Sequence, residues 1–357
     1  MSDIEKRKSE HIDAVLSGKA AQARVSTGLE YVRFEHMALP ELDLSDIDLS
    51  ASLISRRLSA PIIVSSMTGG PKISSSLNLN IAEACQDLGL GFGVGSQRIA
   101  LEGISRSGFG PELRKAAPDV PILANFGAAQ LQHWDGVTMA QRAVDMISAD
   151  ALIIHLNPLQ EAVQRGGDTN WSGLFAKIGH LCHQCPFPII VKEVGAGISA
   201  TLARRLMDIG VAGIDVAGLG GTSWAAVEAA RAETNEQRLI ADAFRDWGIP
   251  TATAIRTVRE ACPDAVIIGS GGLRDGLDCA KAIRIGADIT GVAAGVLPGA
   301  VAGTREIQQK LSILIEQLRI ACFCTGSANL AALRRAPLLS SSDSIVDNRR
   351  MNRPGAD

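Results

Sequence analysis

Short apolar runs that alternate with amphipathic stretches of helical length constrain this chain more than any other feature. The runs are rich in Ile, Val and Ala, and this alternation predicts a parallel sheet whose strands are connected by helices. There are eight such runs, the number that closes a (β/α)8 barrel, the TIM barrel. We expect strands at residues 61–65, 91–95, 121–125, 151–155, 188–192, 213–217, 265–270 and 289–293.

Three segments of similar sequence support a repeated βα unit. Residues 148–154, 210–216 and 286–292 each carry the end of a predicted helix into the next predicted strand. A doubly wound nucleotide-binding fold is the competing α/β architecture. It is disfavoured because no strand is followed by G-x-G-x-x-G, and because a G-x-x-x-x-G-K-[ST] loop is also missing.

The length of 357 residues allows one barrel with additions at both ends, because α/β barrels commonly exceed about 250 residues as a single unit. We place the barrel at residues 59–336. Residues 1–58 form an N-terminal extension that we expect to fold over one barrel mouth as a lid. Residues 337–357 are polar, with SSSDS and NRRMNRPGAD, and predict a flexible C-terminal tail.

Composition excludes several classes of protein. Apolar residues make up 46% of the chain and charged residues 20%, which is incompatible with disorder throughout. With 35 Lys and Arg against 38 Asp and Glu, the chain lacks the positive charge of a nucleic-acid-binding protein. The charged start and the lack of a long apolar run predict a soluble, cytoplasmic protein that makes no membrane contact.

The seven cysteines are interpreted as reduced thiols, since a chain of this size needs no disulfides to fold. Cys182-His-Gln-Cys185 has a spacing found in metal and redox sites. A zinc site would need a second ligand pair, which Cys322-Phe-Cys324 does not provide. Cysteines on a helix face are therefore the preferred interpretation.

Polar residues follow most of the predicted strands, at the end where barrel enzymes build their active sites. They are Met67–Gly70, Ser96–Arg98, Asn125–Gly127, His155–Glu161, Lys192–Glu193, Asp215 with residues 218–224, and Ser270–Gly272. All of them are expected at one mouth of the barrel.

Two glycine-containing turns suggest a phosphate site. Ser270-Gly271-Gly272 and Ala293-Ala294-Gly295 follow the last two strands, where barrels bind phosphate through backbone N–H groups and a short helix N-terminus. Each could instead be a tight βα corner. Because Gly220-Gly221-Thr222-Ser223 is expected beside both turns, we favour a phosphate.

Lys192, at the end of the fifth strand, has three possible roles. It could form a Schiff base, balance the charge of a cofactor, or pair inside the barrel with Glu193 or Asp215. A phosphate site nearby favours the second role, since a fixed lysine would stabilise the negative charge of a reduced flavin.

His155, Asn157, Gln160 and Glu161 lie within seven residues after a buried strand. One carboxylate among neutral polar groups suggests Mg²⁺ held partly by water and by a ligand phosphate. His155 could equally be a core histidine with satisfied hydrogen bonds.

Arg7, Lys8 and His11 would lie on one face of a helical turn, where Arg98 could join them across the mouth. A frayed, solvated N-terminus is the alternative. A dianionic ligand, already suggested by the phosphate turns, favours the basic cluster.

Together these motifs resemble the type 2 isopentenyl-diphosphate isomerase family. The resemblance extends over about residues 5–300, and Gly269, where Ala is expected, departs from the pattern without affecting a predicted site. The motifs, in order, are RKSEH 7–11, MTGG 67–70, SQR 96–98, NFG 125–127, HLNPLQE 155–161, KEVGAGIS 192–199, DVAGLGGTSW 215–224 and SGGLRDGLD 270–278.

The resemblance implies a barrel enzyme of isoprenoid biosynthesis that interconverts isopentenyl and dimethylallyl diphosphates. It implies FMN, reduced by NADPH, a Mg²⁺ ion held by Glu161, and a homo-oligomer, either a tetramer or an octamer. Implied FMN contacts are Thr68, Gly69, Ser96, Asn125, Lys192, Thr222, Gly271, Gly272, Ala293 and Ala294. Implied substrate contacts are Arg7, Lys8, His11, Arg98, His155, Asn157 and Gln160, the last three being the candidate catalytic residues.

The isomerisation involves no net redox change, yet a flavin could still contribute to it. Protonating an unactivated alkene produces a species like a tertiary carbocation, and no ordinary His or carboxylic acid is a strong enough acid for that step. A reduced flavin offers another proton donor and an electron-rich ring beneath the developing cation. Gln160 would orient the reacting carbon or relay a proton.

Two rivals remain. A flavin oxidoreductase would need a His base after a late strand or a Cys nucleophile, but every histidine lies at or before His183, and no Cys occurs between Cys185 and Cys262. A non-catalytic FMN-binding barrel would need neither the basic cluster at residues 7–11 nor the HLNPLQE motif. The presence of both argues for an enzyme.

Overall fold

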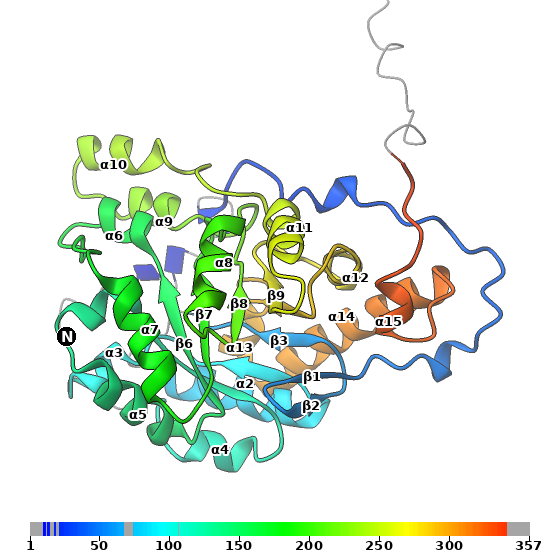
Figure 1. Ribbon diagram of the computed structural model, residues 1–357, viewed down its shortest axis with the longest axis horizontal. Helices are drawn as coiled ribbons and strands as arrows, with labels where there is room; N and C mark the ends of the chain where they lie inside the picture. The colour runs from blue at the N-terminus through cyan, green and yellow to red at the C-terminus, as the bar shows by residue number, and fades with distance from the viewer. Residues whose placement is uncertain are drawn as a thin grey trace, which may run out of the picture.

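Eight parallel strands close into a barrel, as Figure 1 shows for the computed structural model. The structure describes residues 10–11, 13–14, 18, 21–67, 74–105 and 107–340. The barrel order is β10-β3-β4-β5-β6-β7-β8-β9, so each strand pairs with its neighbour in sequence and the last strand returns to the first. Their bounds are β3 Ile62–Val64, β4 Gly91–Gly93, β5 Ile122–Gly127, β6 Ala151–Leu156, β7 Ile189–Glu193, β8 Gly213–Asp215, β9 Val266–Ser270 and β10 Ile289–Val292. The predicted (β/α)8 barrel is confirmed, with strand ends displaced by one or two residues.

Helices connect the strands and cover the outside of the barrel (Figure 1). Several begin at a side-chain cap that satisfies a free backbone N–H: Asp135, Ser199, Ser223 and Asp275 cap α5, α8, α9 and α12. The helices are α2 Ser74–Leu88, α3 Arg98–Leu101, α4 Glu112–Ala116, η4 Ala128–Gln132, α5 Gly136–Ile147, α6 Pro158–Val163, α7 Leu174–Gln184, α8 Ala200–Asp208, α9 Trp224–Ala230, α10 Asn235–Asp242, α11 Thr251–Ala261, α12 Gly276–Arg284, α13 Leu297–Ala302, α14 Thr304–Cys324 and α15 Leu330–Leu333. Two short 3-10 turns, η2 Leu29–Tyr31 and η3 Leu44–Asp46, lie in the N-terminal extension.

Side chains alternate between the two faces of each strand, and this alternation places the polar residues. One set packs outward against the helices, as Leu152 and Ile154 do on β6. The other set fills the barrel with an apolar layer: Ile63, Leu123, Ala151, Ile153, Ile190, Ile268 and Ile289. Two residues further along the same strands, the inward positions are Ser65, Asn125, His155, Lys192 and Ser270. A polar layer therefore lies directly above the apolar one, at the carboxyl ends of the strands.

A hairpin from the N-terminal extension closes the opposite end of the barrel. Strands β1 Ala51–Leu53 and β2 Arg56–Leu58 pair antiparallel through a turn in which Ile54 and Ser55 both have positive φ. Leu53 and Leu58 belong to the same buried cluster as the apolar layer inside the barrel. We expected residues 1–58 to fold over one mouth of the barrel as a lid, and this part of the extension instead covers the opposite end.

Residues 21–28 lie at the carboxyl-end mouth. Ala23 donates to the Gly221 carbonyl at 3.0 Å, Ser223 donates to the Ala21 carbonyl at 2.8 Å, and Ala252 donates to the Thr27 carbonyl at 2.9 Å. The extension thus reaches both ends of the barrel.

The predicted boundary of the C-terminal tail is a few residues early. Glu35 donates to the Pro337 carbonyl at 3.0 Å, and Leu339 donates to the Arg33 carbonyl at 2.9 Å. Phe34 and Leu338 form an antiparallel bridge between them. The residues just after 336 pair with the N-terminal extension because their backbone groups meet another extended segment, and the rest of the predicted tail, 341–357, lies outside the described residues.

Across the described part of the chain, no helix combines the length and the apolar character that crossing a bilayer requires. Cys182 lies on α7 and Cys185 caps its end, so both belong to one helix as predicted. The seven cysteines are all free thiols.

Candidate active site

A cavity of about 600 Å³ opens at the carboxyl ends of the barrel strands. Its volume lies in the range of pockets that enclose cofactors and small ligands. All predicted site residues that the structure describes line this one cavity. They are His11, Ser96, Arg98, Asn125, His155, Asn157, Gln160, Glu161, Lys192, Thr222, Gly271, Gly272, Ala293 and Ala294.

Four of the predicted residues lie outside the described part of the chain. They are Arg7 and Lys8 of the predicted basic cluster, and Thr68 and Gly69 after the first strand of the barrel. Their roles stay predictions from the sequence.

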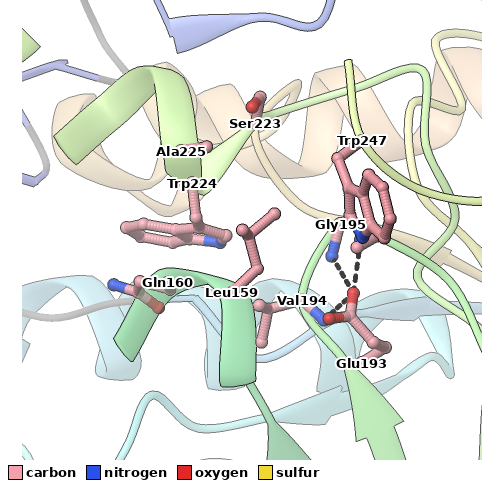
Figure 2. Close-up of a pocket in the computed structure, with 10 residues that line it drawn as sticks. Leu159, Gln160, Glu193, Val194, Gly195, Ser223, Trp224, Ala225 and Trp247 are labelled. Atoms are coloured by element: carbon pink, nitrogen blue, oxygen red, sulfur yellow. Dashed lines mark hydrogen bonds between the residues drawn. The ribbon is translucent and has the colours of Figure 1, made fainter. Parts of the chain in front are cut away.

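Lys192 is buried at the end of β7, in register with His155 on β6 and with Asp215 on β8. Its Nζ donates to the backbone carbonyl of Glu193 at 2.6 Å. The carboxylate of Glu193 is not its partner, because Oε2 accepts from the backbone N–H groups of residues 194–197, including Val194 and Gly195 at 2.6 Å each (Figure 2). The alternative of a Lys192–Glu193 side-chain salt bridge is therefore wrong, and the Lys192 side chain lines the cavity.

Asp215 lies fully buried in the layer that contains Lys192. Its Oδ1 accepts from the hydroxyl of Ser270, whereas Oδ2 has no hydrogen-bond partner among the described residues. Burial raises the pKa of Asp215 above its ordinary value, although the charge of Lys192 acts in the opposite direction. The pair places one cation and one buried acid at the same level of the barrel.

The residues at this end of the cavity fit a flavin with a phosphate. Ser65 and Ser66 line the cavity at the end of β3, and their hydroxyls have no hydrogen-bond partner among the described residues. Gly271 has φ +104° and a Cβ there would lie 2.2 Å from the Gly218 carbonyl oxygen, so the turn depends on glycine. A Cβ at Gly295 would meet nothing within 4 Å, which leaves open space beside the second turn. Unsatisfied donors, an open backbone turn and a buried lysine are what a flavin ring and its phosphate require.

A chain of hydrogen bonds fixes His155. Gln97, which is fully buried, accepts from the backbone N–H of Asn125 at 2.9 Å and donates to the Ala143 carbonyl at 2.9 Å. The Asn125 side chain in turn donates to the Val94 carbonyl at 3.2 Å, and its Oδ1 lies 2.8 Å from His155 Nδ1. The ring is thereby held at the cavity, which it lines, and one of its nitrogens has a hydrogen-bond partner.

Asn157 and Glu161 form the group that could hold a cation. Asn157 Nδ2 donates to Glu161 Oε1 at 2.8 Å, and the backbone N–H of Asp168 donates to Glu161 Oε2 at 2.8 Å. The amide oxygen Asn157 Oδ1 is buried without a hydrogen-bond partner among the described residues. A buried carboxylate beside an unsatisfied amide oxygen fits Mg²⁺, which prefers oxygen ligands and keeps several waters. Within the described residues, no set of three or more His, Cys, Asp or Glu is arranged to hold a metal, so the remaining ligands would come from water and substrate.

Arg98 lies between two carboxylates at the rim of the cavity. Its Nε is 3.0 Å from Glu102 Oε1, and its Nη1 is 2.9 Å from Asp168 Oδ2. Burial by itself would lower the pKa of Arg98, but the two carboxylates raise it. The guanidinium is therefore a fixed cation at the rim.

His11 brings the N-terminal segment to the cavity. Its Nε2 lies 2.9 Å from Glu228 Oε1, and its ring packs edge-on against Trp224 with centroids 5.1 Å apart. Glu228 also accepts from Gln160 Nε2 at 3.3 Å and from Arg231 Nη1 at 2.6 Å. Although burial would raise the pKa of Glu228, these contacts with His11, Arg231 and Gln160 lower it. Figure 2 shows Gln160 and Trp224 in the smaller pocket next to the main cavity.

Sequence reasoning missed three residues that organise this site: Gln97, Asp168 and Glu228. Gln97 lies inside the SQR motif, but its side chain is buried against α5 and does not line the cavity. Glu228 could have been found, because it is the one charged residue in the apolar run Trp224–Ala230, where an isolated carboxylate needs a partner.

Comparisons with known proteins agree with this geometry. The FMN-dependent dehydrogenase family matches residues 122–340. The isopentenyl-diphosphate delta-isomerase of Stutzerimonas stutzeri is 58% identical over 94% of this chain and 97% of its own length. That of Xanthobacter autotrophicus is 55% identical over 93% and 97%, and that of Nostoc is 47% identical over 94% and 95%.

Solved structures share the fold at low sequence identity. A lactate oxidase of Pediococcus acidilactici superposes with a TM-score of 0.68 at 18% identity, covering 94% of this chain and 93% of that one. A mandelate oxidase crystallised with (S)-2-phenylpropionate gives 0.66 at 19% identity, covering 94% and 97%. At such identities the likeness extends to the fold alone.

Proposed function

Because the chain belongs to the isopentenyl-diphosphate delta-isomerase family and, within it, has the barrel of FMN-dependent dehydrogenases, we propose that it interconverts isopentenyl and dimethylallyl diphosphates on FMN. We further propose that the flavin works in its reduced form, that NADPH supplies the electrons, and that Mg²⁺ binds the diphosphate. One observation carries the proposal: the described residues predicted for flavin, substrate and metal all line the same cavity.

The flavin would lie over the polar layer of the barrel. Lys192 would place a positive charge near its ring, with Ser96, Asn125 and Thr222 around it. The two turns, Gly271–Gly272 and Ala293–Ala294, would bind its phosphate through the backbone. When bound, reduced FMN supplies an exchangeable proton and an electron-rich ring to a reaction without net redox change.

The diphosphate would lie between the rim and Glu161. Arg98 and His11 line this side, and the predicted contacts Arg7 and Lys8 would join them from the N-terminal segment. Glu161, with Asn157 Oδ1 beside it, would hold Mg²⁺ against the phosphate oxygens. Charge-assisted contacts of this kind fix the position of the substrate.

Gln160 would act at the reacting carbon. Its Oε1 accepts from Asn157 at 3.3 Å while its Nε2 donates to Glu228 at 3.3 Å, so the amide is held at both ends. Such an amide can orient the carbon that loses or gains a proton, or relay that proton. Trp224, in the same region, gives an apolar and π-rich wall that suits a developing carbocation.

We also propose a cytoplasmic homo-oligomer, either a tetramer or an octamer. The free thiols support a reducing compartment. Exposed apolar side chains near α10 support self-association: Leu239, Ile240, Phe244 and Trp247 are 38–65% exposed. Light scattering of the FMN-loaded protein would measure the assembly, and a monomer would contradict it.

The test is an anaerobic assay with FMN, NADPH and Mg²⁺ in which NMR follows isopentenyl diphosphate. We expect dimethylallyl diphosphate to appear only when all three additions are present. A 2-hydroxy-acid oxidase is the rival, so lactate and mandelate are tested in parallel under air. Oxidation of either acid without isomerisation would overturn the proposal.

A further inference from the structure

Glu193 carries a buried carboxylate that the proposed reaction does not use. It lies at the end of β7, and its Oε2 accepts from the backbone N–H groups of residues 194–197, the four residues that follow it. Figure 2 shows the bonds from Val194 and Gly195, which are 2.6 Å each. Successive N–H groups turned toward one centre form an anion-binding concavity, and here the chain supplies the anion itself. The loop of residues 194–197 is therefore closed around its own carboxylate.

This 194–197 loop is also packed against the rest of the cavity wall. Ile249 donates to the Ala196 carbonyl at 2.9 Å. A Cβ added to Gly195 would lie 2.6 Å from the Thr222 carbonyl oxygen, so the loop lies directly against another lining segment of the cavity. The loop therefore has little room to shift while the carboxylate holds it.

The same loop determines where the Lys192 amine lies. Nζ donates to the Glu193 carbonyl at 2.6 Å, and the side chain lines the cavity. Asp215, the partner of Lys192 in register on β8, offers a buried Oδ2 that has no hydrogen-bond partner among the described residues. The amine is thus bound to a neutral carbonyl although a buried carboxylate lies in the same layer. Asp215 does not line the cavity, so pairing with it would take the charge of Lys192 out of the cavity.

We propose that Glu193 is a positioning residue for Lys192 and, through it, sets the reduction potential of the bound flavin; this rests on FMN, the cofactor of the proposed function. With the carboxylate in place, the loop holds the Glu193 carbonyl where Lys192 donates to it. Without the carboxylate, four N–H groups lose their acceptor and the loop has to rearrange. The amine would then move to Asp215, because a carboxylate binds an ammonium group more strongly than a carbonyl does.

The position of this amine matters because reduced flavin carries negative charge. A cation beside the ring stabilises the reduced form more than the oxidised form and so raises the reduction potential. An amine that moved to Asp215 would be neutralised there, and the reduced flavin would lose that stabilisation. Loss of the Glu193 carboxylate should therefore lower the potential, in the same direction as loss of Lys192 itself.

The experiment is a reductive titration of the FMN-loaded protein against a reference dye, without substrate, which measures the midpoint potential. We expect Glu193→Ala to lose about tenfold of the preference for reduced over oxidised FMN, a fall of about 30 mV for a two-electron couple. Glu193→Gln should stay within about threefold of the wild type, because its amide oxygen can still accept from the loop. Glu260→Ala, at an exposed position near the end of α11, is the matched control and should keep the wild-type potential.

Two further backgrounds show whether Glu193 acts through Lys192. In Lys192→Ala, the added Glu193→Ala change should leave the potential where it is, because no amine is left to position. In Asp215→Asn, the same change should lower the potential much less than in the wild type, because the amine has no carboxylate to move to. A purely structural role for Glu193 would lower the potential equally in all three backgrounds.

A crystal structure of the FMN-loaded wild type gives an answer that needs no variant to fold. Lys192 Nζ within hydrogen-bond distance of the Glu193 carbonyl supports the proposal, and Nζ paired with Asp215 or moved to any other group overturns it. Three results of the titrations also overturn it: a wild-type potential in Glu193→Ala, equal falls in Glu193→Ala and Glu193→Gln, or equal falls in all three backgrounds.

The anaerobic assay on the same preparations separates this proposal from the proposed function. Isomerisation by the wild type, together with an unchanged potential in Glu193→Ala, leaves the proposed function standing and removes the positioning role. A chain that binds no FMN removes both.

Discussion

At the scale of single residues, Lys192 carries the sharpest expectation because it is a buried cation whose Nζ donates to a backbone carbonyl rather than to a carboxylate. We expect Lys192→Ala to weaken FMN binding by about ten- to hundredfold, since a charge-assisted contact is worth roughly 1.5–3 kcal/mol. Fluorescence titration of the apoprotein measures the affinity. Lys115→Ala, at an exposed position on α4, is the matched control. Equal affinities in the two variants would contradict the placement of the flavin.

Asp215 gives a pH prediction. Its pKa is raised by burial, so the folded protein binds a proton more tightly than the unfolded chain, whose aspartates titrate near about 3.9. Its contribution to stability is therefore present at low pH and is lost as pH rises through the raised pKa. We expect the melting temperature of Asp215→Asn, relative to wild type, to increase between pH 4 and pH 7. The opposite trend would mean that attraction to Lys192 outweighs burial.

Glu161 and Gln160 are neighbours in sequence with different expected roles. Glu161→Gln should keep FMN but lose most of its Mg²⁺ dependence and activity, because the amide removes the anionic ligand and preserves the shape. Gln160→Asn should keep the response to Mg²⁺ and lower turnover. The measurement is a Mg²⁺ titration of initial rates in both variants. Identical responses would show that the division of roles is incorrect.

At the scale of elements, the β1–β2 hairpin is expected to support the whole barrel. Leu58 is fully buried against the apolar layer inside the barrel, so Leu58→Ala should cost about 2–5 kcal/mol of unfolding free energy. Leu39→Ala is the control, because Leu39 is 74% exposed and surface changes usually stay within about 0.5 kcal/mol. Urea denaturation followed by circular dichroism measures both. Similar midpoints for the two variants would mean that the hairpin does not contribute to the core.

The same hairpin is a part of the fold that could not be predicted from the sequence. The barrel strands could be predicted because each is an apolar run followed by a helix, and the polar residues after them had to meet at one mouth. Leu53 and Leu58 gave no such signal, because a three-residue strand in a polar extension has no periodicity to detect. Its burial depends on a contact with the bottom of the barrel, which only the tertiary structure provides.

The candidate site, like the fold, could be predicted from the sequence only in part. Ser96, Asn125 and Lys192 were predictable because they lie at or just after the carboxyl ends of predicted strands. Gln97 and Asp168 were not, because they act on Asn125, Arg98 and Glu161 from outside the cavity. A sequence shows which residues reach a mouth, but it does not show which side chains hold them there.

At the scale of the whole molecule, the extension and the barrel are interdependent. The N-terminal residues 21–28 lie at the active-site mouth, residues 51–58 close the other end, and residues 33–35 pair with residues 337–339. The lid prediction therefore concerns a segment whose later part is anchored to the barrel and to the C-terminal end of the described chain.

The start of the extension gives the last prediction. His11 reaches Glu228 and Trp224 at the cavity, beside the place proposed for the diphosphate. Arg7, outside the described residues, should contact the substrate, so Arg7→Ala should raise the Michaelis constant for isopentenyl diphosphate about ten- to hundredfold through loss of a charged hydrogen bond. FMN affinity should not change, and Arg57→Ala, exposed on β2 at the opposite end of the barrel, should have no effect. Substrate added to the reduced enzyme should also protect about the first thirty residues from limited proteolysis, because paired charges order the segment. Unchanged cleavage with an unchanged Michaelis constant would leave Arg98, His155 and Mg²⁺ as the diphosphate contacts, and the first residues would then have no part in closing the site.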